Sequence, residues 1–224
     1  EKIVIAAGSE PILPPIEGRE LAITSDQLLF LPEFPAELVL VGAGPIGLEM
    51  AGAFTDLGAQ VTVVALETEI LPMFDGDVAA YIRKLLELRG VTFHLDSKVT
   101  RITRRNGGLV TRIEKSGSAL EVRSAQVCLA VGRRFNPRRV GADQISLELA
   151  GPGLKVTPHL RTSLPHIYAA GDICSRYKFT HAADAMAQIV IQNALFPHPF
   201  GLAYASVDSL IMPWCTFTEP EIAH

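Results

Sequence analysis

The stretch Leu38-Val39-Leu40-Val41-Gly42-Ala43-Gly44-Pro45-Ile46-Gly47 decides the fold of this chain of 224 residues. Its first four residues form an uninterrupted apolar run, which is typical of a strand buried on both faces of a parallel sheet. Three glycines follow in the pattern G-x-G-x-x-G, and a helix with an apolar side is expected from about Pro45 to Leu57. The segment therefore predicts a strand, a tight turn and a helix in immediate succession.

The residues that follow continue the same alternation. Gln60 to Val64 is expected to be a second strand, and Val91 to Leu95 a third. Between them, Asp75 can cap a helix that has Asp77 in its first turn and stops at Gly90. Strands alternating with helices in this way predict an α/β fold with a Rossmann-like parallel sheet.

The pattern then changes to short strands separated by turn residues. Asn106-Gly107 and Ser116-Gly117 are typical hairpin turns. We interpret this region as an antiparallel β-meander, with strands at Lys98 to Thr103, Leu109 to Glu114, Leu120 to Arg123 and Val127 to Val131. Further on, a strand from Ile167 to Ala170 ends at Gly171-Asp172, and a helix is expected from about His181 to Leu195.

The three glycines of the first turn suit a nucleotide's pyrophosphate. Gly42 permits the tight turn, Gly44 lets the backbone approach the phosphates, and Gly47 lets the helix pack on the strand. The N–H groups and the dipole at the helix start then favour the phosphate charge. The strand–turn–helix context predicts phosphate binding rather than a merely structural turn.

The choice between NAD and NADP depends on the end of the second strand. An acidic residue about 20 residues after the first glycine ordinarily binds the adenosine ribose. Ala65 occupies that strand end, and Glu67 follows it, either as a ribose ligand or as a solvated charge. No Arg or Lys lies between Val64 and Phe74 to receive a 2′-phosphate, which favours NAD slightly and leaves NADP open.

Composition excludes several classes of function. The formal net charge of −4 argues against a nucleic-acid-binding face, and no apolar run reaches the length of about 18 residues that a membrane span needs. Glu1 leads straight into a strand-like run, so we expect no signal peptide and a cytoplasmic protein. Cys128, Cys174 and Cys215 form no C-x-x-C pair, so we expect reduced, mostly buried thiols and no metal site.

Several motifs together resemble one family over the whole chain. The segments that carry the resemblance are Ile5 to Pro11 (with Ala7 where the family usually has Thr), Val39 to Glu49, Ala130 to Arg134, Ile167 to Ile173, Phe179 to Ala183, and Pro213-Trp214-Cys215 to Ala223. In this order they resemble the pyridine nucleotide-disulfide oxidoreductases, which include dihydrolipoamide dehydrogenase, glutathione reductase and mercuric-reductase-like flavoproteins.

The resemblance implies two cofactor sites. NAD(P)H would contact Gly42, Ala43, Gly44, Pro45, Ile46, Gly47, Glu49, Glu67, Val99 and Gly132, with Val99 on the adenine side and Gly132 on the nicotinamide side. FAD would contact Ala7, Gly8, Ser9, Asp172, Thr180, His181 and Ala182. Asp172 would accept a hydrogen bond from a ribityl hydroxyl. For His181 we favour a backbone role at a helix start over that of a catalytic base, and we expect no catalytic residue in this chain.

The resemblance also implies a domain order. Residues 1–11 would end the first part of an FAD domain, 12–133 would form the NAD(P)-binding domain, 134–205 would return to the FAD domain, and 206–224 would begin a dimerisation domain. The family's own flavin-binding G-x-G-x-x-G and redox C-x-x-x-x-C motifs are not in this sequence. We therefore expect the middle of a longer, homodimeric flavoprotein, whose isolated chain would bind nucleotide weakly with little turnover.

In that longer protein, hydride would pass from NAD(P)H to FAD and on to a disulfide or a metal substrate. Two alternatives stay open from the sequence. One is a flavin NADH oxidase or dehydrogenase that needs no dithiol, and the other is a nucleotide-binding module without catalysis. The flavin-type motif Ile167 to Asp172 argues against the second alternative.

Overall fold

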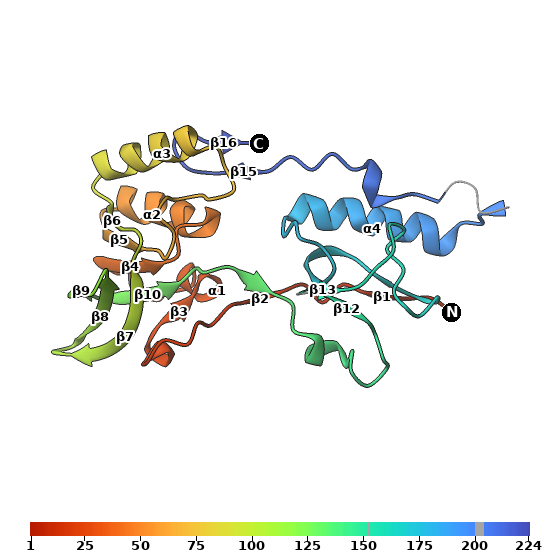
Figure 1. Cartoon of the computed structure of the whole chain (residues 1–224), viewed down its shortest axis with the longest axis horizontal. Helices are drawn as coiled ribbons and strands as arrows, with labels where there is room; N and C mark the ends of the chain where they lie inside the picture. The colour runs from red at the N-terminus through yellow and green to blue at the C-terminus, as the bar shows by residue number, and fades with distance from the viewer. Residues whose placement is uncertain (152, 200–203) are drawn as a thin grey trace. The chain divides into compact units, whose positions relative to one another are not determined.

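In the computed structural model, residues 1–151, 153–199 and 204–224 are described, and they form two compact units (Figure 1). The first unit consists of Glu1–Glu10 and Arg133–Trp214, and the second of Pro11–Gly132 and Cys215–His224. The segment expected at 206–224 is therefore divided between the two units, and its assignment to a dimerisation domain stays a prediction. Within the expected range 134–205, residues 152 and 200–203 lie outside the described residues.

The second unit contains a five-stranded parallel sheet in the order β3-β10-β4-β5-β6. The sheet thus confirms the Rossmann-like α/β class. Its strands are β3 (Ile23–Thr24), β4 (Glu37–Val41), β5 (Gln60–Val64), β6 (Thr92–His94) and β10 (Gln126–Leu129). Its helices are α1 (Ser25–Leu28), α2 (Pro45–Asp56) and α3 (Gly76–Leu88), with the 3-10 helix η1 (Arg19–Leu21).

Strand β4 shows why the central run is apolar throughout. Leu38 and Leu40 point to one face and pack with residues of α2 and α3, such as Leu48 and Leu86. Val39 and Val41 point to the other face and pack with residues of the meander. Because successive side chains of a strand alternate, a strand covered on both faces needs apolar residues at every position. Figure 1 shows α2 and α3 on one side of β4 and the meander on the other.

The meander has three strands, not the four expected. They are β7 (Lys98–Arg105), β8 (Gly108–Lys115) and β9 (Ser118–Ser124), paired antiparallel in that order. The prediction that Val127 to Val131 is a fourth meander strand was wrong, because β10 inserts between β3 and β4 as a parallel strand. Val127, Cys128 and Leu129 are at most 1% exposed, as a central strand requires.

The helix ends follow the sequence signals with one exception. Gly58 and Gly90, just past α2 and α3, have φ of 98° and 103°, the left-handed region that favours glycine. Asp75 occupies the N-cap position of α3 as expected, but its side chain makes no capping hydrogen bond to the described residues. Asp77 lies in the first turn, where the helix dipole favours a negative charge.

The first unit is assembled from two distant segments. Strand β1 (Ile3–Ile5) pairs parallel with β14 (Ile167–Ala169), and Tyr168 and Ala169 are buried there. Helix α4 (Thr180–Leu195) begins one residue before the expected start. The shorter elements are β2 (Glu10–Pro11), β11 (Arg133–Arg134), β12 (Leu149–Ala150), β13 (Gly153–Leu154), η2 (Pro137–Val140), η3 (Gly171–Ile173) and η5 (Val207–Ser209). The final hairpin, β15 (Cys215–Thr216) and β16 (Ile222–Ala223), belongs to the second unit.

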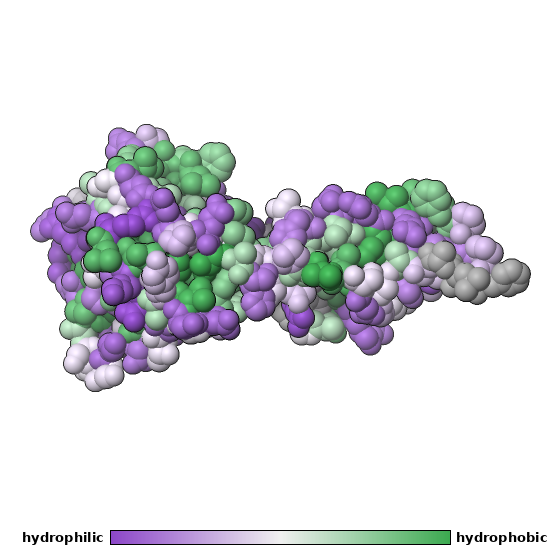
Figure 2. Space-filling view, turned by 90° about the horizontal axis from the view of Figure 1, so that it is seen from above, coloured by the Kyte–Doolittle hydropathy of each residue, from purple (hydrophilic) through white to green (hydrophobic). Residues whose placement is uncertain are grey.

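On the face seen in Figure 2, hydrophobic and hydrophilic residues are interspersed over both units. Among the described residues, no helix is both long enough and apolar enough to span a bilayer.

Candidate functional site

The glycine turn, Gly42 to Gly47, lies at the carboxyl end of β4. Gly42 has φ of 117°, and its N–H donates to the carbonyl of Val64 at 2.8 Å. A Cβ placed on Gly42 would lie 2.5 Å from the carbonyl oxygen of Ala130. The fold itself therefore requires glycine here, because the chain turns sharply between the ends of β5 and β10.

Gly47 is also explained by the fold. A Cβ on this residue would lie well inside contact distance of the Gly42 carbonyl oxygen. Glycine thus lets the first turn of α2 lie directly on the glycine turn, with Gly44 at the N-cap and Pro45 at the first helical position.

Gly44 differs from the other two. Its φ of −80° and ψ of −179° are open to any residue, and no described atom lies within 4 Å of a Cβ built there. Neither backbone strain nor packing requires glycine at this position. What a Cβ would fill is the open space in front of the first turn of α2, where the helix dipole and N–H groups favour an anion.

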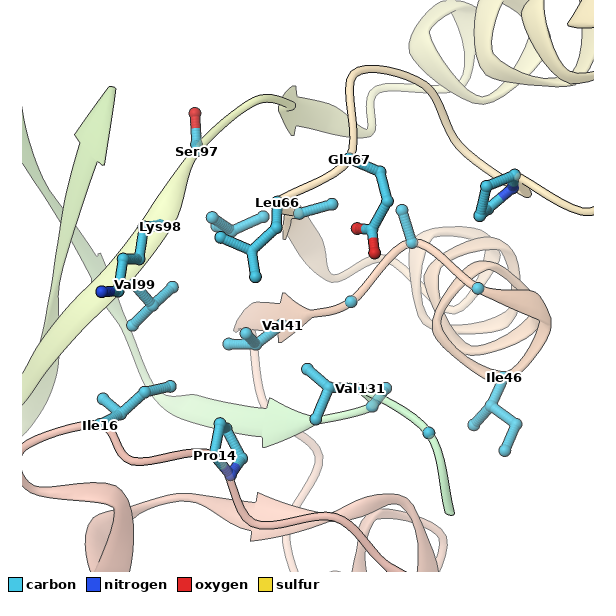
Figure 3. A pocket seen from close by; sticks show the side chains of 18 of the residues that line it. Pro14, Ile16, Val41, Ile46, Leu66, Glu67, Ser97, Lys98, Val99 and Val131 are labelled. Atoms are coloured by element: carbon cyan, nitrogen blue, oxygen red, sulfur yellow. The ribbon is translucent and has the colours of Figure 1, made fainter. Parts of the chain in front are cut away.

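That space belongs to a cavity of about 530 Å³ within the second unit. Its wall is formed by the loops at the carboxyl ends of the parallel strands, where ligands bind in open α/β sheets. Figure 3 shows the apolar residues Val41, Val131 and Pro14 around its middle, with Val99 to one side. The lining residues are Pro14, Pro15, Ile16, Val41, Gly42, Ala43, Gly44, Pro45, Ile46, Val64, Ala65, Leu66, Glu67, Pro72, Ser97, Lys98, Val99, Ala130, Val131 and Gly132.

The structure brings most of the predicted nucleotide residues together. Gly42, Ala43, Gly44, Pro45, Ile46, Glu67, Val99 and Gly132 line the cavity. Gly47 and Glu49 do not: Gly47 packs against the turn, and the Glu49 carboxylate accepts a 3.0 Å hydrogen bond from the Phe217 N–H.

Sequence reasoning missed the cavity wall formed by Pro14 to Ile16 and by Ser97 and Lys98. These residues are far in sequence from the glycine turn, and the topology alone brings them beside it. Ser97 and Lys98 could have been predicted from their position, because they follow closely after the third predicted strand, and the carboxyl ends of parallel strands form the ligand site.

The loop from Leu66 to Phe74 is fixed over the glycine turn. The Leu71 N–H donates to the carbonyl of Ala43 at 3.0 Å, and Ile70 and Leu71 are buried. Glu69 forms an ion pair with Arg83 of α3 at 3.0 Å. The loop therefore closes one side of the cavity with a defined conformation.

A second polar group lies in the first unit. The Ser9 hydroxyl donates to the Asp172 carboxylate at 2.5 Å, and Arg133 Nε donates to the same hydroxyl oxygen at 2.9 Å. Arg133 also donates to the Ser9 carbonyl at 2.9 Å. Since the hydroxyl oxygen accepts from Arg133, its proton is free to point at Asp172, and the three groups hold the carboxylate in one orientation.

The remaining predicted flavin residues lie in two places, a small pocket and the start of α4. Ala7, Gly8 and Ser9 line a small pocket together with Phe135, Asn136 and Arg139. Gly171, with φ of 80°, lets Ala183 of α4 come close, so the helix begins beside Asp172.

Of the predicted residues on α4, Thr180 and His181 are exposed, whereas Ala182 is fully buried and offers only its backbone. The His181 ring bonds through Nε2 to the Pro213 carbonyl at 2.7 Å, and the predicted backbone role of His181 stays a prediction.

The three cysteines are free; Cys128 is buried as predicted, whereas Cys174 and Cys215 are only half-buried. Burial raises the pKa of Cys128 to about 12, and burial together with the Asp172 charge raises the pKa of Cys174 to about 12. Thiols with such pKa values are poor nucleophiles at neutral pH. Among the described residues, no group of His, Cys, Asp and Glu side chains could hold a metal ion.

The parallel sheet, the glycine turn and the cavity at its carboxyl edge define an α/β protein of the Rossmann-like class. The family model of the pyridine nucleotide-disulphide oxidoreductases matches residues 1–187. The chain belongs to this family, as the motifs indicated.

Curated relatives and solved structures agree with this assignment. Dihydrolipoyl dehydrogenase of Bacillus subtilis (strain 168) is 34% identical over 227 residues, covering 100% of this chain and 47% of the relative. Glutathione reductase of Burkholderia cepacia is 31% identical, covering 99% and 48%. The HOCl-induced flavoprotein disulfide reductase RclA from Escherichia coli matches with a TM-score of 0.89 and 26% identity, covering 100% of this chain and 50% of that one. The chain thus spans about half the length of the proteins it matches.

Proposed function

We propose that the cavity of the second unit binds NAD(P)H, as the nicotinamide nucleotide site of a flavin-dependent oxidoreductase. The observation that carries the proposal is Gly44, which the fold does not require to be glycine and which borders the cavity at the start of α2. A bound pyrophosphate supplies the missing reason, because a side chain at this position would keep the phosphates from the backbone.

The cavity's ends suit the two halves of such a nucleotide. Val99 and Ile46 lie on opposite sides of the cavity in Figure 3, and we assign the adenine to the Val99 side and the nicotinamide to the Ile46 side; Glu67 and Gly132 also line the cavity. The apolar wall suits the flat faces of both ring systems, and the glycine turn between them would receive the phosphates. The work of these residues is to bind the nucleotide and to orient it.

We further propose that the first unit contributes part of an FAD site. Ser9 and Arg133 hold Asp172 in one orientation, and the carboxylate would accept a hydrogen bond from a hydroxyl of the flavin's ribityl chain. When both cofactors are bound, they would supply hydride transfer from the nicotinamide to the flavin and on to a disulfide or a metal substrate. The high pKa values of Cys128 and Cys174 support the view that the reactive thiols are not among these residues.

Gly44→Ala is the substitution that tests the nucleotide site. The fold accepts a Cβ there, so we expect the free energy of unfolding to change by no more than about 1 kcal/mol, a weaker N-cap being offset by lower backbone entropy in the unfolded chain. Nucleotide affinity should fall by roughly tenfold or more, because the methyl group enters the space of the phosphates. Calorimetric titration with NADH and with ADP-ribose measures the affinity of the wild-type chain and its decrease in the variant.

Gly76→Ala is the matched control. Gly76 also has no described atom within 4 Å of its Cβ position, but it lies at the start of α3 and does not line the cavity. It should leave the affinity unchanged. If the wild-type chain binds neither ligand, or if Gly44→Ala binds as well as Gly76→Ala does, the proposal is wrong.

A further inference from the structure

We infer that the cavity selects NADH over NADPH through the carboxylate of Glu67, a residue two positions past the strand end where a ribose-binding acid ordinarily stands. This inference rests on the proposed function, since it concerns the same cavity.

Ala65, at the strand end itself, cannot distinguish NADH from NADPH. Ala65 is 3% exposed, and its backbone is fully engaged, because its N–H donates to the His94 carbonyl at 3.0 Å and its carbonyl accepts from the Ser97 N–H at 2.8 Å. Its methyl group has no polar atom to offer a ribose. The recognition of the hydroxyl must therefore come from a neighbouring side chain that lines the cavity.

Glu67 is placed for that task by its backbone. Its carbonyl accepts a hydrogen bond from the Asp96 N–H at 2.8 Å, which ties the loop to the segment leading into β7. On its other side the loop is anchored by Leu71, whose N–H donates to Ala43. Figure 3 shows the Glu67 carboxylate pointing toward the glycine turn, and not out of the cavity.

The charges around the cavity favour a hydroxyl over a phosphate. Among the described residues that line it, Glu67 is the one acid and Lys98 the one base. Figure 3 shows the Lys98 ammonium group beyond Val99, on the far side of the cavity from the Glu67 carboxylate. The loop from Leu66 to Phe74 contains Glu67 and Glu69 but no Lys or Arg.

A carboxylate accepts a hydrogen bond from the ribose 2′-hydroxyl, and such charge-assisted bonds are among the stronger ones. A 2′-phosphate would instead place up to two negative charges beside Glu67 without a cation to receive them. Discrimination of roughly tenfold to a hundredfold in affinity follows from the hydrogen bond alone.

ADP-ribose and 2′-phospho-ADP-ribose are the probes that isolate this effect, because they differ only at the 2′-position. Titrated calorimetrically into the 224-residue chain, ADP-ribose should bind at least roughly tenfold more tightly. In Glu67→Gln, the ratio of the two affinities should fall severalfold, because ADP-ribose loses its charge-assisted hydrogen bond and binds more weakly, while the phosphorylated probe no longer meets a negative charge and binds more tightly. Glu33→Gln, an equal change of charge at an exposed residue away from the cavity, should leave the ratio unchanged.

Two results would overturn the inference while leaving the proposed function intact. One is equal binding of the two probes by the wild-type chain. The other is tighter binding of the phosphorylated probe that is lost in Lys98→Ala. That result would mean that Lys98 selects the 2′-phosphorylated nucleotide. A chain that binds neither probe would overturn both the inference and the proposed function.

Discussion

Each glycine of the turn at Gly42 to Gly47 has a different physical reason to lack a side chain. Gly42 needs a backbone conformation with positive φ, and Gly47 needs close contact between the helix and the turn. Gly44 needs neither, and the cavity accounts for it. Glycine thus serves a turn at Gly42, a packing contact at Gly47 and, as we propose, a ligand at Gly44.

Gly42→Ala should therefore behave differently from Gly44→Ala. The substitution forces a side chain into a positive-φ conformation and into contact with the Ala130 carbonyl. We expect it to lower the free energy of unfolding by about 2 to 4 kcal/mol. Urea unfolding followed by circular dichroism measures the change, and a variant as stable as Gly76→Ala would show that the turn does not require its glycine.

At the residue scale, the sequence predicted the part of the site that lies in one motif. Gly42 to Ile46, Glu67, Val99 and Gly132, which were predicted as nucleotide contacts, line the cavity. Pro14 to Ile16, Ser97 and Lys98 were missed because their place beside the turn depends on how the loops fold back on the strand ends. Glu49 was assigned to the nucleotide from the motif, but its carboxylate is engaged by the Phe217 N–H.

At the scale of elements, the three sequential strands of the sheet and the two helices between them were predicted well, because each has a clear periodicity and a clear stop. Strand β10 was misplaced for a physical reason. A short apolar strand has the same sequence pattern in an antiparallel meander as in the centre of a parallel sheet. Its partners β3 and β4 lie about a hundred residues earlier, and nothing local in the sequence reports them.

The meander covers one face of the parallel sheet, and two of its leucines test this packing. Leu109 of β8 is 2% exposed and packs with Val39, Val41 and Leu129, whereas Leu120 of β9 is 39% exposed. Leu109→Ala should lower the free energy of unfolding by about 2 to 5 kcal/mol. Leu120→Ala should change it by less than about 1 kcal/mol. Equal losses in the two variants, measured by urea unfolding, would mean that β8 is not packed on the sheet.

At the scale of the whole molecule, the buried thiols make stability depend on alkaline pH. The pKa of Cys128 rises from 9.0 to about 12 through burial, so between these values the folded chain keeps a proton that the unfolded chain releases. Unfolding is therefore increasingly favoured as the pH rises through this window, by up to about 1.4 kcal/mol per pH unit for this one group.

Cys128→Ala separates this effect from other alkaline titrations. The variant should be less stable at pH 7, because it removes a fully buried sulfur, yet its free energy of unfolding should fall less steeply than that of the wild type between pH 9 and 12. Urea unfolding at a series of pH values measures both slopes. Parallel curves for the two proteins would show that the Cys128 proton is not held in the folded state.

The second unit interrupts the first, and this governs the order in which the chain can acquire structure during synthesis. Strand β1 is made long before β14, with which it pairs, so Ile3 lacks this strand partner until Ile167 has left the ribosome. Meanwhile the strands from β3 to β10 find every partner among themselves, and the pairing of β2 with β11 brings the two ends of the interrupting segment side by side. The two segments of the first unit are then joined through a folded second unit whose ends lie close together, and not through a long flexible loop. The entropic cost of pairing β1 with β14 is therefore lower. We expect the segment from β3 to β10 to be structured while β1 is still unpaired.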